Sequence, residues 1–169
     1  MIIHIEKGNH YRSNHLLTKL KIGRSWCQKY TIRFLSSAEY ELSENKTQVN
    51  KLVGCGQLHH HFNSIRVGWR YSVAKNCVEL FSYSYTNGER HYTFLKDVKI
   101  GQDFNVIVEY EAKGKKSLYR ILVDEILCYN SWELTKWWQR VPLLYECFPY
   151  FGGTMPAPKN INILIKSKK

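Results

Sequence analysis

The stretch from Cys77 to Leu95 constrains the fold more than any other part of the chain. It begins CVELFSYSYT and ends in RHYTFL, and both halves are rich in the aromatic and β-branched residues typical of strands. Between them stands Asn87-Gly88, the strongest short signal for a two-residue turn that joins antiparallel strands. The stretch is therefore predicted to form a β-hairpin.

Two-residue alternation, which is typical of half-buried strands, recurs along most of the chain. In IRVGWRY it places Ile65, Val67 and Trp69 on one face and Arg66 and Arg70 on the other. A second hairpin is predicted around the turn at 112–116. Further strand candidates are IIHIE at 2–6, YTIRFL at 30–35, FNVIVEYE at 104–111, SLYRILVDE at 117–125 and NINILIK at 160–166.

Eight or more short strands separated by turn residues predict an all-β protein. We expect a two-sheet antiparallel β-sandwich of the jelly-roll kind, with residues 1–169 forming one domain. The segment 131–141 breaks the alternation and predicts a short helix or an ordered loop, with Ser131 as its cap. Its tryptophans 132, 137 and 138 can plug one end of the sandwich or form a platform for a ligand.

The formal net charge of +11 suits an anionic glycan, nucleic acid or an acidic protein partner, but it also suits a basic surface that only aids solubility. The five cysteines are widely spaced and are expected to be free and mostly buried. The first residues do not resemble a signal peptide, and no stretch approaches the ~20 apolar residues of a membrane span. We therefore expect synthesis in the cytoplasm and no membrane partner.

Three consecutive histidines precede the strand IRVGWRY. His59 and His61 would share a strand face, but a zinc site needs further ligands, and none is close in sequence. A polar segment leading into the strand is the simpler interpretation, so no metal is predicted. No cofactor is predicted either, because the chain has no Gly-rich phosphate loop, and it also lacks the GxSxG motif of a serine nucleophile.

Arg66 and Arg70 flank Gly68, which would leave a shallow floor between two forked cationic side chains. The alternative is a water-facing strand whose arginines form ion pairs. On the neighbouring strand the aromatic row of Phe81, Tyr83 and Tyr85 can stack on sugar rings or bases, or it can belong to the core. Alternation favours the core for the aromatic row, because the serines between these residues suit a core poorly.

Six stretches occur in a recognisable order: GNHYRSNHL, FLSSAEYEL, NKLVGCG, HHHFNSIRVGWRY, SYSYTNGERHY and YECFPYFGGTMPAPKNINILI. Together they resemble a family of small uncharacterised proteins from Bacteroides-type bacteria and their tailed phages. The closing stretch also resembles the last strand of concanavalin-A-like, laminarinase-type jelly rolls. The resemblance implies a lectin-like β-sandwich, but it brings no functional residues with it.

We expect a non-enzymatic binding or structural module that contacts glycan or virion proteins. In a virion it would serve as a decoration or tail-associated protein. Assembly into a homo-oligomer is a further alternative. The candidate ligand-binding residues are His60, Arg66, Trp69, Arg70, Tyr83 and Tyr85.

Two other functions stay open. A jelly-roll polysaccharide lyase or hydrolase would use the residue types of Gln57, His60, Arg70 and Tyr83. Nucleic-acid binding, which is less favoured, rests only on the basic charge and the aromatic residues.

Overall fold

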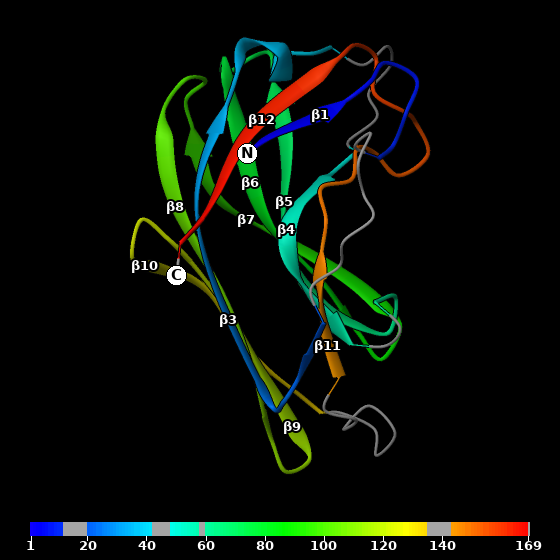
Figure 1. Cartoon of the computed structure of the whole chain (residues 1–169), viewed down its shortest axis with the longest axis vertical. Coiled ribbons are helices and arrows are strands. Elements are labelled where there is room, and N and C mark those ends of the chain that lie inside the picture. The colour runs from blue at the N-terminus through cyan, green and yellow to red at the C-terminus, as the bar shows by residue number, and fades with distance from the viewer. Residues whose placement is uncertain (12–19, 42–47, 58–59, 135–142, 169) are drawn as a thin grey trace.

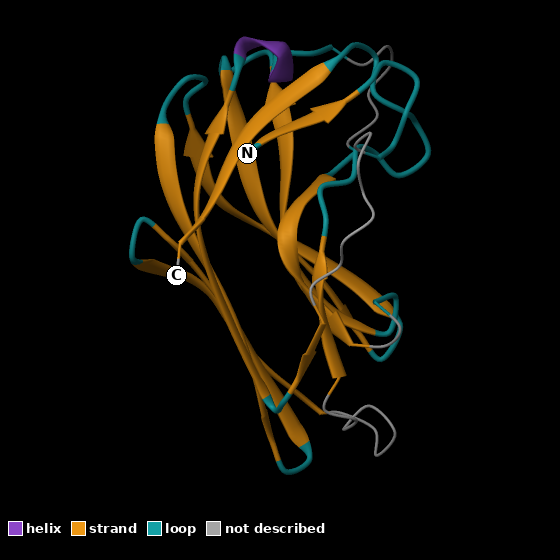
Figure 2. Cartoon of the chain, viewed as in Figure 1, coloured by secondary structure: helices purple, strands orange, loops and turns teal. Residues whose placement is uncertain are grey.

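In the computed structural model the chain folds into a sandwich of two antiparallel sheets with six strands each (Figures 1 and 2). The structure describes residues 1–11, 20–41, 48–57, 60–134 and 143–168, without the side chains of 132–134. In these parts of the chain, no helix has the length and apolar character needed to span a membrane. The prediction of an all-β jelly-roll sandwich is confirmed.

The strands follow the order β1-β12-β3-β8-β9-β10 in sheet A and β2-β11-β4-β5-β6-β7 in sheet B. Sheet A consists of β1 (Ile2–Ile5), β3 (Ser25–Phe34), β8 (Asp103–Lys113), β9 (Lys116–Val123), β10 (Ile126–Leu134) and β12 (Ile161–Lys168). Sheet B consists of β2 (Leu20–Ile22), β4 (Asn50–Gln57), β5 (Asn63–Ser72), β6 (Cys77–Thr86), β7 (Glu89–Val98) and β11 (Leu143–Cys147). A short 3-10 turn, η1 (Ser36–Ala38), is drawn purple in Figure 2.

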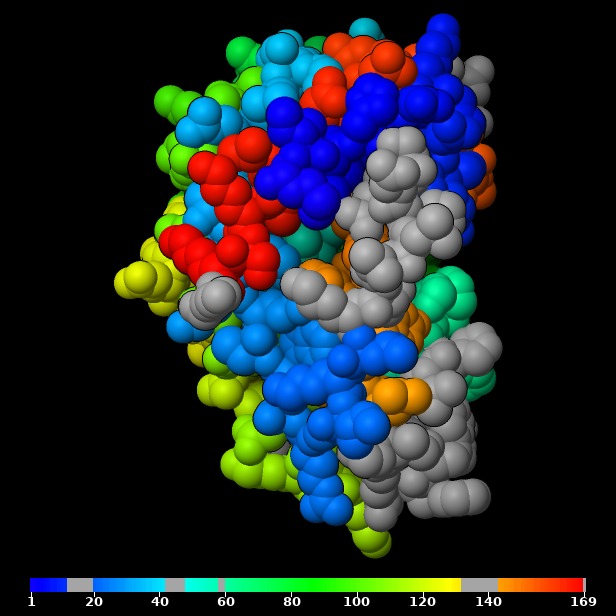
Figure 3. All heavy atoms as spheres, viewed as in Figure 1, coloured from blue at the N-terminus to red at the C-terminus, as the bar shows by residue number. Residues whose placement is uncertain are grey.

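Both predicted hairpins are present. Asn87 and Gly88 join β6 to β7 with φ angles of 53° and 90°, the left-handed values that a tight hairpin turn requires at both positions. Gly114, with φ of 58°, turns the chain from β8 into β9. The first and last strands also pair, with Ile2 opposite Leu164, so the dark blue and red segments lie together in Figure 3.

The core lies between the two sheets and receives side chains from most strands of both, whereas the three residues of β2 are exposed. Ile65, Val67 and Trp69 of β5 and Leu80 of β6 belong to it, and the Trp69 side chain is only 1% exposed. The Trp69 ring lies 4.9 Å from the ring of Phe34 on sheet A. Trp69 therefore joins the two sheets and does not reach the outer surface, which corrects its prediction as a ligand-binding residue.

The aromatic row of β6 lies on the opposite side of sheet B from the core. Phe81 and Tyr83 pack with Val49 in a small separate cluster, whereas Ser82 and Ser84 lie on the core side and are buried. The expectation that the aromatic row faces the core was wrong, because Leu80 and the neighbouring Val78 fill the core from the serine face.

The prediction of a short helix or ordered loop at 131–141 also needs correction. Ser131–Leu134 are not helical: they end β10 and pair with Lys116–Tyr119 of β9. The remaining residues of the predicted helix or loop, 135–141, lie outside the described residues, as do the side chains of its three tryptophans. Strands β2, β4, β10 and β11 were not predicted. The cysteines are free, and Cys55, Cys77 and Cys147 are buried as expected.

Because Trp69 fills the space between the sheets, Trp69→Ala is expected to lower the free energy of unfolding by about 3–5 kcal/mol. Urea denaturation measures this loss. Val73→Ala, an exposed side chain in the turn after β5, is the control and should change stability by less than about 0.5 kcal/mol. A small effect of Trp69→Ala would show that the ring is not part of the core.

Candidate functional site

The outer face of sheet B, defined as the face turned away from the core, carries a row of chemistry-bearing side chains across four strands. The register places Gly54 of β4 opposite Arg66 of β5, Arg66 opposite Tyr83 of β6, and Tyr83 opposite Tyr92 of β7. Residues directly opposite each other in a sheet have neighbouring side chains. The pairing of the sheet therefore brings a guanidinium and two phenol rings into one row.

The glycine in this row is required by its neighbours. A Cβ on Gly54 would lie 2.1 Å from the Ile65 carbonyl oxygen and 3.0 Å from Cγ of Arg66. The absence of a side chain there leaves room for Arg66, which is 9% exposed and lies beside Cys147 of β11. The Nε donor of Arg66 is buried and has no hydrogen-bond partner among the described residues. An unpaired buried donor of this kind is rare in folded proteins.

Gly68 does not provide the open floor that the sequence suggested. A Cβ at this position would lie 2.5 Å from a methyl carbon of Val49 and 3.5 Å from Cβ of Phe81. The segment before β4 therefore covers Gly68, and no flat ligand can lie between Arg66 and Arg70 at that point.

Lys51, which the register places opposite Gly68, is the second buried cation of this face. Its Nζ donates to the Gly152 carbonyl oxygen at 2.9 Å and lies 4.7 Å from the centre of the Tyr83 ring and 5.3 Å from that of Tyr150. Burial lowers the pKa of Lys51 to about 8, and the nearby positive charge of Arg66 and then of Arg90 adds to the effect.

The position of the Gly152 carbonyl depends on a backbone that only glycine adopts readily. Gly152 has φ of 85°, and a Cβ there would lie 2.0 Å from the Met155 carbonyl oxygen. The Asn50 side-chain oxygen accepts from the Gly152 N–H at 2.6 Å. Gly152 therefore fixes the acceptor of Lys51 in place.

A cavity of about 260 Å³ opens beside Lys51 on this face. Two cations, two phenol rings and small polar groups surround it, and no carboxylate is among the described residues that line it. The lining consists of Gln48, Val49, Lys51, Tyr83, Arg90, Tyr92, Gly153 and Thr154. Such a lining favours an anion that carries a flat or ring-shaped body.

Tyr83 forms the wall between Lys51 and Arg90. Burial raises the pKa of Tyr83 to about 12; the hydroxyl of Tyr85 next to it acts in the same direction, and the positive charge of Arg90 opposes both. The Tyr83 hydroxyl is therefore protonated at neutral pH and can donate a hydrogen bond to a ligand in the cavity.

His60 and His61 border the same face just before the start of β5. Nδ1 of His60 lies 2.7 Å from the Tyr145 hydroxyl of β11, and the His61 ring contacts the Tyr85 ring edge to face. Gly56 gives them space, since a Cβ there would lie 3.2 Å from Cβ of His60. In the described parts of the chain, no group of three or more His, Cys, Asp or Glu residues is arranged to hold a metal.

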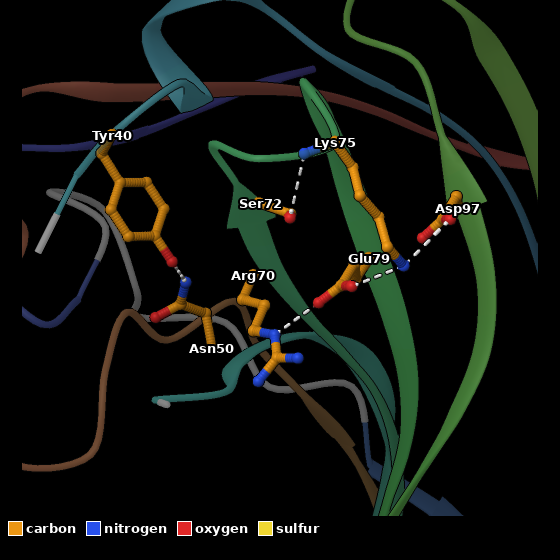
Figure 4. Close-up of polar contacts among 7 residues, drawn as sticks. All are labelled: Tyr40, Asn50, Arg70, Ser72, Lys75, Glu79 and Asp97. Carbon is orange, nitrogen blue, oxygen red and sulfur yellow. Dashed lines mark hydrogen bonds and ion pairs between the residues drawn. The ribbon is translucent and has the colours of Figure 1, made fainter. Parts of the chain in front are cut away.

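Arg70 shares the outer face but is neutralised. Its Nε donates to Glu79 at 2.5 Å (Figure 4). Its guanidinium lies over the Phe81 ring at 4.9 Å. Lys75 approaches the same carboxylate at 2.9 Å and reaches Asp97 at 3.3 Å. Arg70 is therefore paired with a carboxylate, whereas Arg66 is not.

The structure thus separates the residues that the sequence grouped as one site. Arg66 and Tyr83 lie together, with Tyr85 and His60 further along the same face, whereas Trp69 lies in the core and Arg70 in an ion-pair network. Gln57 donates to the Tyr110 hydroxyl at 2.6 Å in a buried contact between the sheets, so it does not face the cavity. Of the described residues that line the cavity, Tyr83 alone was a candidate, and the charged and aromatic ones missed by sequence reasoning are Lys51, Arg90 and Tyr92.

No protein-family model matches the chain, and no curated protein sequence matches it. Solved structures are similar in fold. The alginate lyase Aly36B has a TM-score of 0.69 at 13% identity, with 98% of this chain and 78% of that chain covered. Its mutant in complex with alginate tetrasaccharide gives 0.68 at 13% identity and the same coverage. A functionally unknown protein from Saccharomyces cerevisiae gives 0.51 at 12% identity, covering 99% and 88%. These likenesses show a shared β-sandwich fold.

The lowered pKa of Lys51 has a consequence for stability. Between its folded value of about 8 and its ordinary value of 10.5, the unfolded chain binds more protons than the folded one, so stability rises with pH in this window. Between pH 8 and pH 10.5 the free energy of unfolding of wild type should therefore rise by about 1–2 kcal/mol relative to that of Lys51→Met. The rise is smaller than the pKa shift alone would give, because the cavity admits water. Urea denaturation of both proteins across this range measures the difference. Parallel stability curves would contradict the burial of a charged Lys51.

Proposed function

We propose that the protein is a carbohydrate-binding module that holds an acidic polysaccharide on the outer face of sheet B. The observation that carries the proposal is the set of cations Lys51, Arg66 and Arg90 on that face. No ion pair joins any of the three to an acid within the described parts of the chain. A bound carboxylate would supply the missing negative charge and an acceptor for the Arg90 guanidinium, which lines the cavity.

The aromatic side chains support a sugar ligand in preference to a small free anion. Tyr83 and Tyr92 line the cavity, and Tyr85 continues the row along β6. Phenol rings pack against the apolar faces of sugar rings while their hydroxyls hydrogen-bond to the rims. The shared fold of an alginate lyase, whose structure with an alginate tetrasaccharide is known, agrees with a ligand of this class.

The resemblance to proteins of tailed phages supports a setting for this binding in a virion. There the module would act as a decoration or tail-associated protein that contacts host glycan or other virion proteins. Mass spectrometry of purified phage particles tests this setting: the chain is expected among the virion proteins, and its absence from the particles would count against it.

Binding is tested with alginate and polygalacturonate as acidic polymers and dextran as a neutral one. Wild type is expected to bind the acidic polymers, more weakly as salt is added, and not to bind dextran. Arg66→Gln and Arg90→Gln should each weaken binding by about 10-fold or more, because Arg90→Gln removes a charge-assisted hydrogen bond and Arg66→Gln removes an uncompensated positive charge close to Lys51. Isothermal titration calorimetry measures the affinities, and circular dichroism checks the fold of each variant.

Arg70→Gln is the matched control, since it removes the same charge from the same face at a side chain that Glu79 already occupies. It should change the affinity by less than about 3-fold. Equal losses for Arg66→Gln, Arg90→Gln and Arg70→Gln would mean that only the overall basic charge matters. Tighter binding of single-stranded DNA than of any polyuronate would favour a nucleic-acid partner instead.

A further inference from the structure

Lys51 combines two properties that simple binding does not need. It lines the cavity, and its ammonium is buried against phenol rings with a carbonyl oxygen as its acceptor and no carboxylate among the lining residues that the structure describes. A binding cation is most effective when it stays charged, whereas this environment favours the neutral amine. A neutral lysine amine at the wall of a cavity is a base.

We propose that this face, besides holding an acidic polysaccharide, cleaves it by β-elimination, with Lys51 as the base and Tyr83 as the acid. The inference rests on the proposed binding function. It names the substrate class as a polymer of 4-linked hexuronates, because the reaction needs a carboxylate next to the carbon that loses its proton.

The geometry supplies each part of the reaction. A neutral Lys51 can keep its hydrogen bond to the Gly152 carbonyl through one N–H and still present its lone pair to the cavity. The centre of the Tyr83 ring lies 4.7 Å from Nζ and both residues line the cavity, so the base and the residue that carries the acid border the same space. Arg90 also lines the cavity, and Arg66 adds its charge from the neighbouring strand. Both stabilise the carboxylate as negative charge develops on it.

The step balances without a metal, an oxidant or water. Lys51 takes the proton from C5 of the uronate, and the electron pair of that C–H bond forms the double bond between C4 and C5. The bond from C4 to the bridging oxygen breaks, and the leaving oxygen takes the proton of the Tyr83 hydroxyl. The proton on Lys51 then passes to the Tyr83 phenolate, which restores both groups.

The environment also sets the protonation states at the start of the reaction. Arg66, Arg90, Tyr83 and Tyr150 face Lys51, and together with burial the two arginines lower its pKa to about 8. Burial raises the pKa of Tyr83 to about 12. The rate should therefore rise as the pH increases through about 8, because a larger fraction of Lys51 becomes the neutral base.

The test is incubation of the full chain with alginate and with polygalacturonate, followed by near-ultraviolet absorbance of the conjugated unsaturated uronate. Mass spectrometry should show product masses that sum to the substrate mass, since hydrolysis would add a water. Lys51→Arg keeps the charge but removes the base, and Tyr83→Phe keeps the ring but removes the acid. Each should lower the rate by about 10²–10⁴-fold, while Tyr83→Phe retains polysaccharide binding. Arg70→Gln is the control with unchanged rate.

The outcomes separate the two proposals. Wild type that binds the polyuronates but forms no unsaturated product on either would overturn the elimination and leave the binding function standing. Full activity of Lys51→Arg would likewise overturn the assigned base. Wild type that binds no acidic polysaccharide would remove both proposals together.

Discussion

The in-register pairing of β4, β5 and β6 is the constraint on which the rest of the molecule depends. Because side chains alternate along a strand, the register that places Trp69 between the sheets also places Arg66 on the outer face. A slip of one residue would exchange the two sets, bringing charge into the core and tryptophan onto the surface. The same strand register therefore fixes both the core and the candidate site. Gly54 is needed in this register because it lies opposite Arg66 and leaves space for the Arg66 side chain.

The outer face holds its cations in an unusual state. Lys51 and Arg66 are nearly as buried as core residues, yet their near neighbours are rings, a carbonyl oxygen, a thiol and other cations. Burying charge without a partner destabilises a folded protein, and groups with strongly shifted pKa values concentrate at functional sites. Arg70 lies on the same strand as Arg66 but differs from it, because the carboxylate of Glu79 neutralises the charge of Arg70. The uncompensated pair is what distinguishes this face from an ordinary basic surface.

Much of the fold could be predicted from the sequence because its strands carry their own signals. The Asn87-Gly88 turn and the alternation in β5, β6 and β12 depend on local backbone preference and on burial of one face. Strand β4 was missed because NKLVGCGQ contains two glycines, which are uncommon inside strands. Glycine is required at both positions because residues from other parts of the chain, Arg66, His60 and Tyr145, occupy the space that side chains would fill. The five residues of β11 are too few to show a period.

The site could be predicted only in part, for a related reason. Arg66 and Tyr83 are neighbours because β5 and β6 pair in this register. Alternation along one strand shows which residues share a face, but it does not show which residue of the next strand lies opposite. Lys51 becomes exceptional only when Gly152, about a hundred residues later in the chain, provides its acceptor. The aromatic row was assigned to the core because serine suits a core poorly. Ser82 and Ser84 nevertheless lie on the core side, buried, with Ser82 bonded to the Thr93 carbonyl.

The most direct test of the account is a crystal structure of the protein with a short oligouronate. The account predicts sugar rings along Tyr83 and Tyr92 on the outer face of sheet B. It also predicts a uronate carboxylate within hydrogen-bond distance of at least one of Arg66 and Arg90. An oligouronate bound on sheet A, or on the outer face of sheet B with its carboxylates turned away from both arginines, would contradict it.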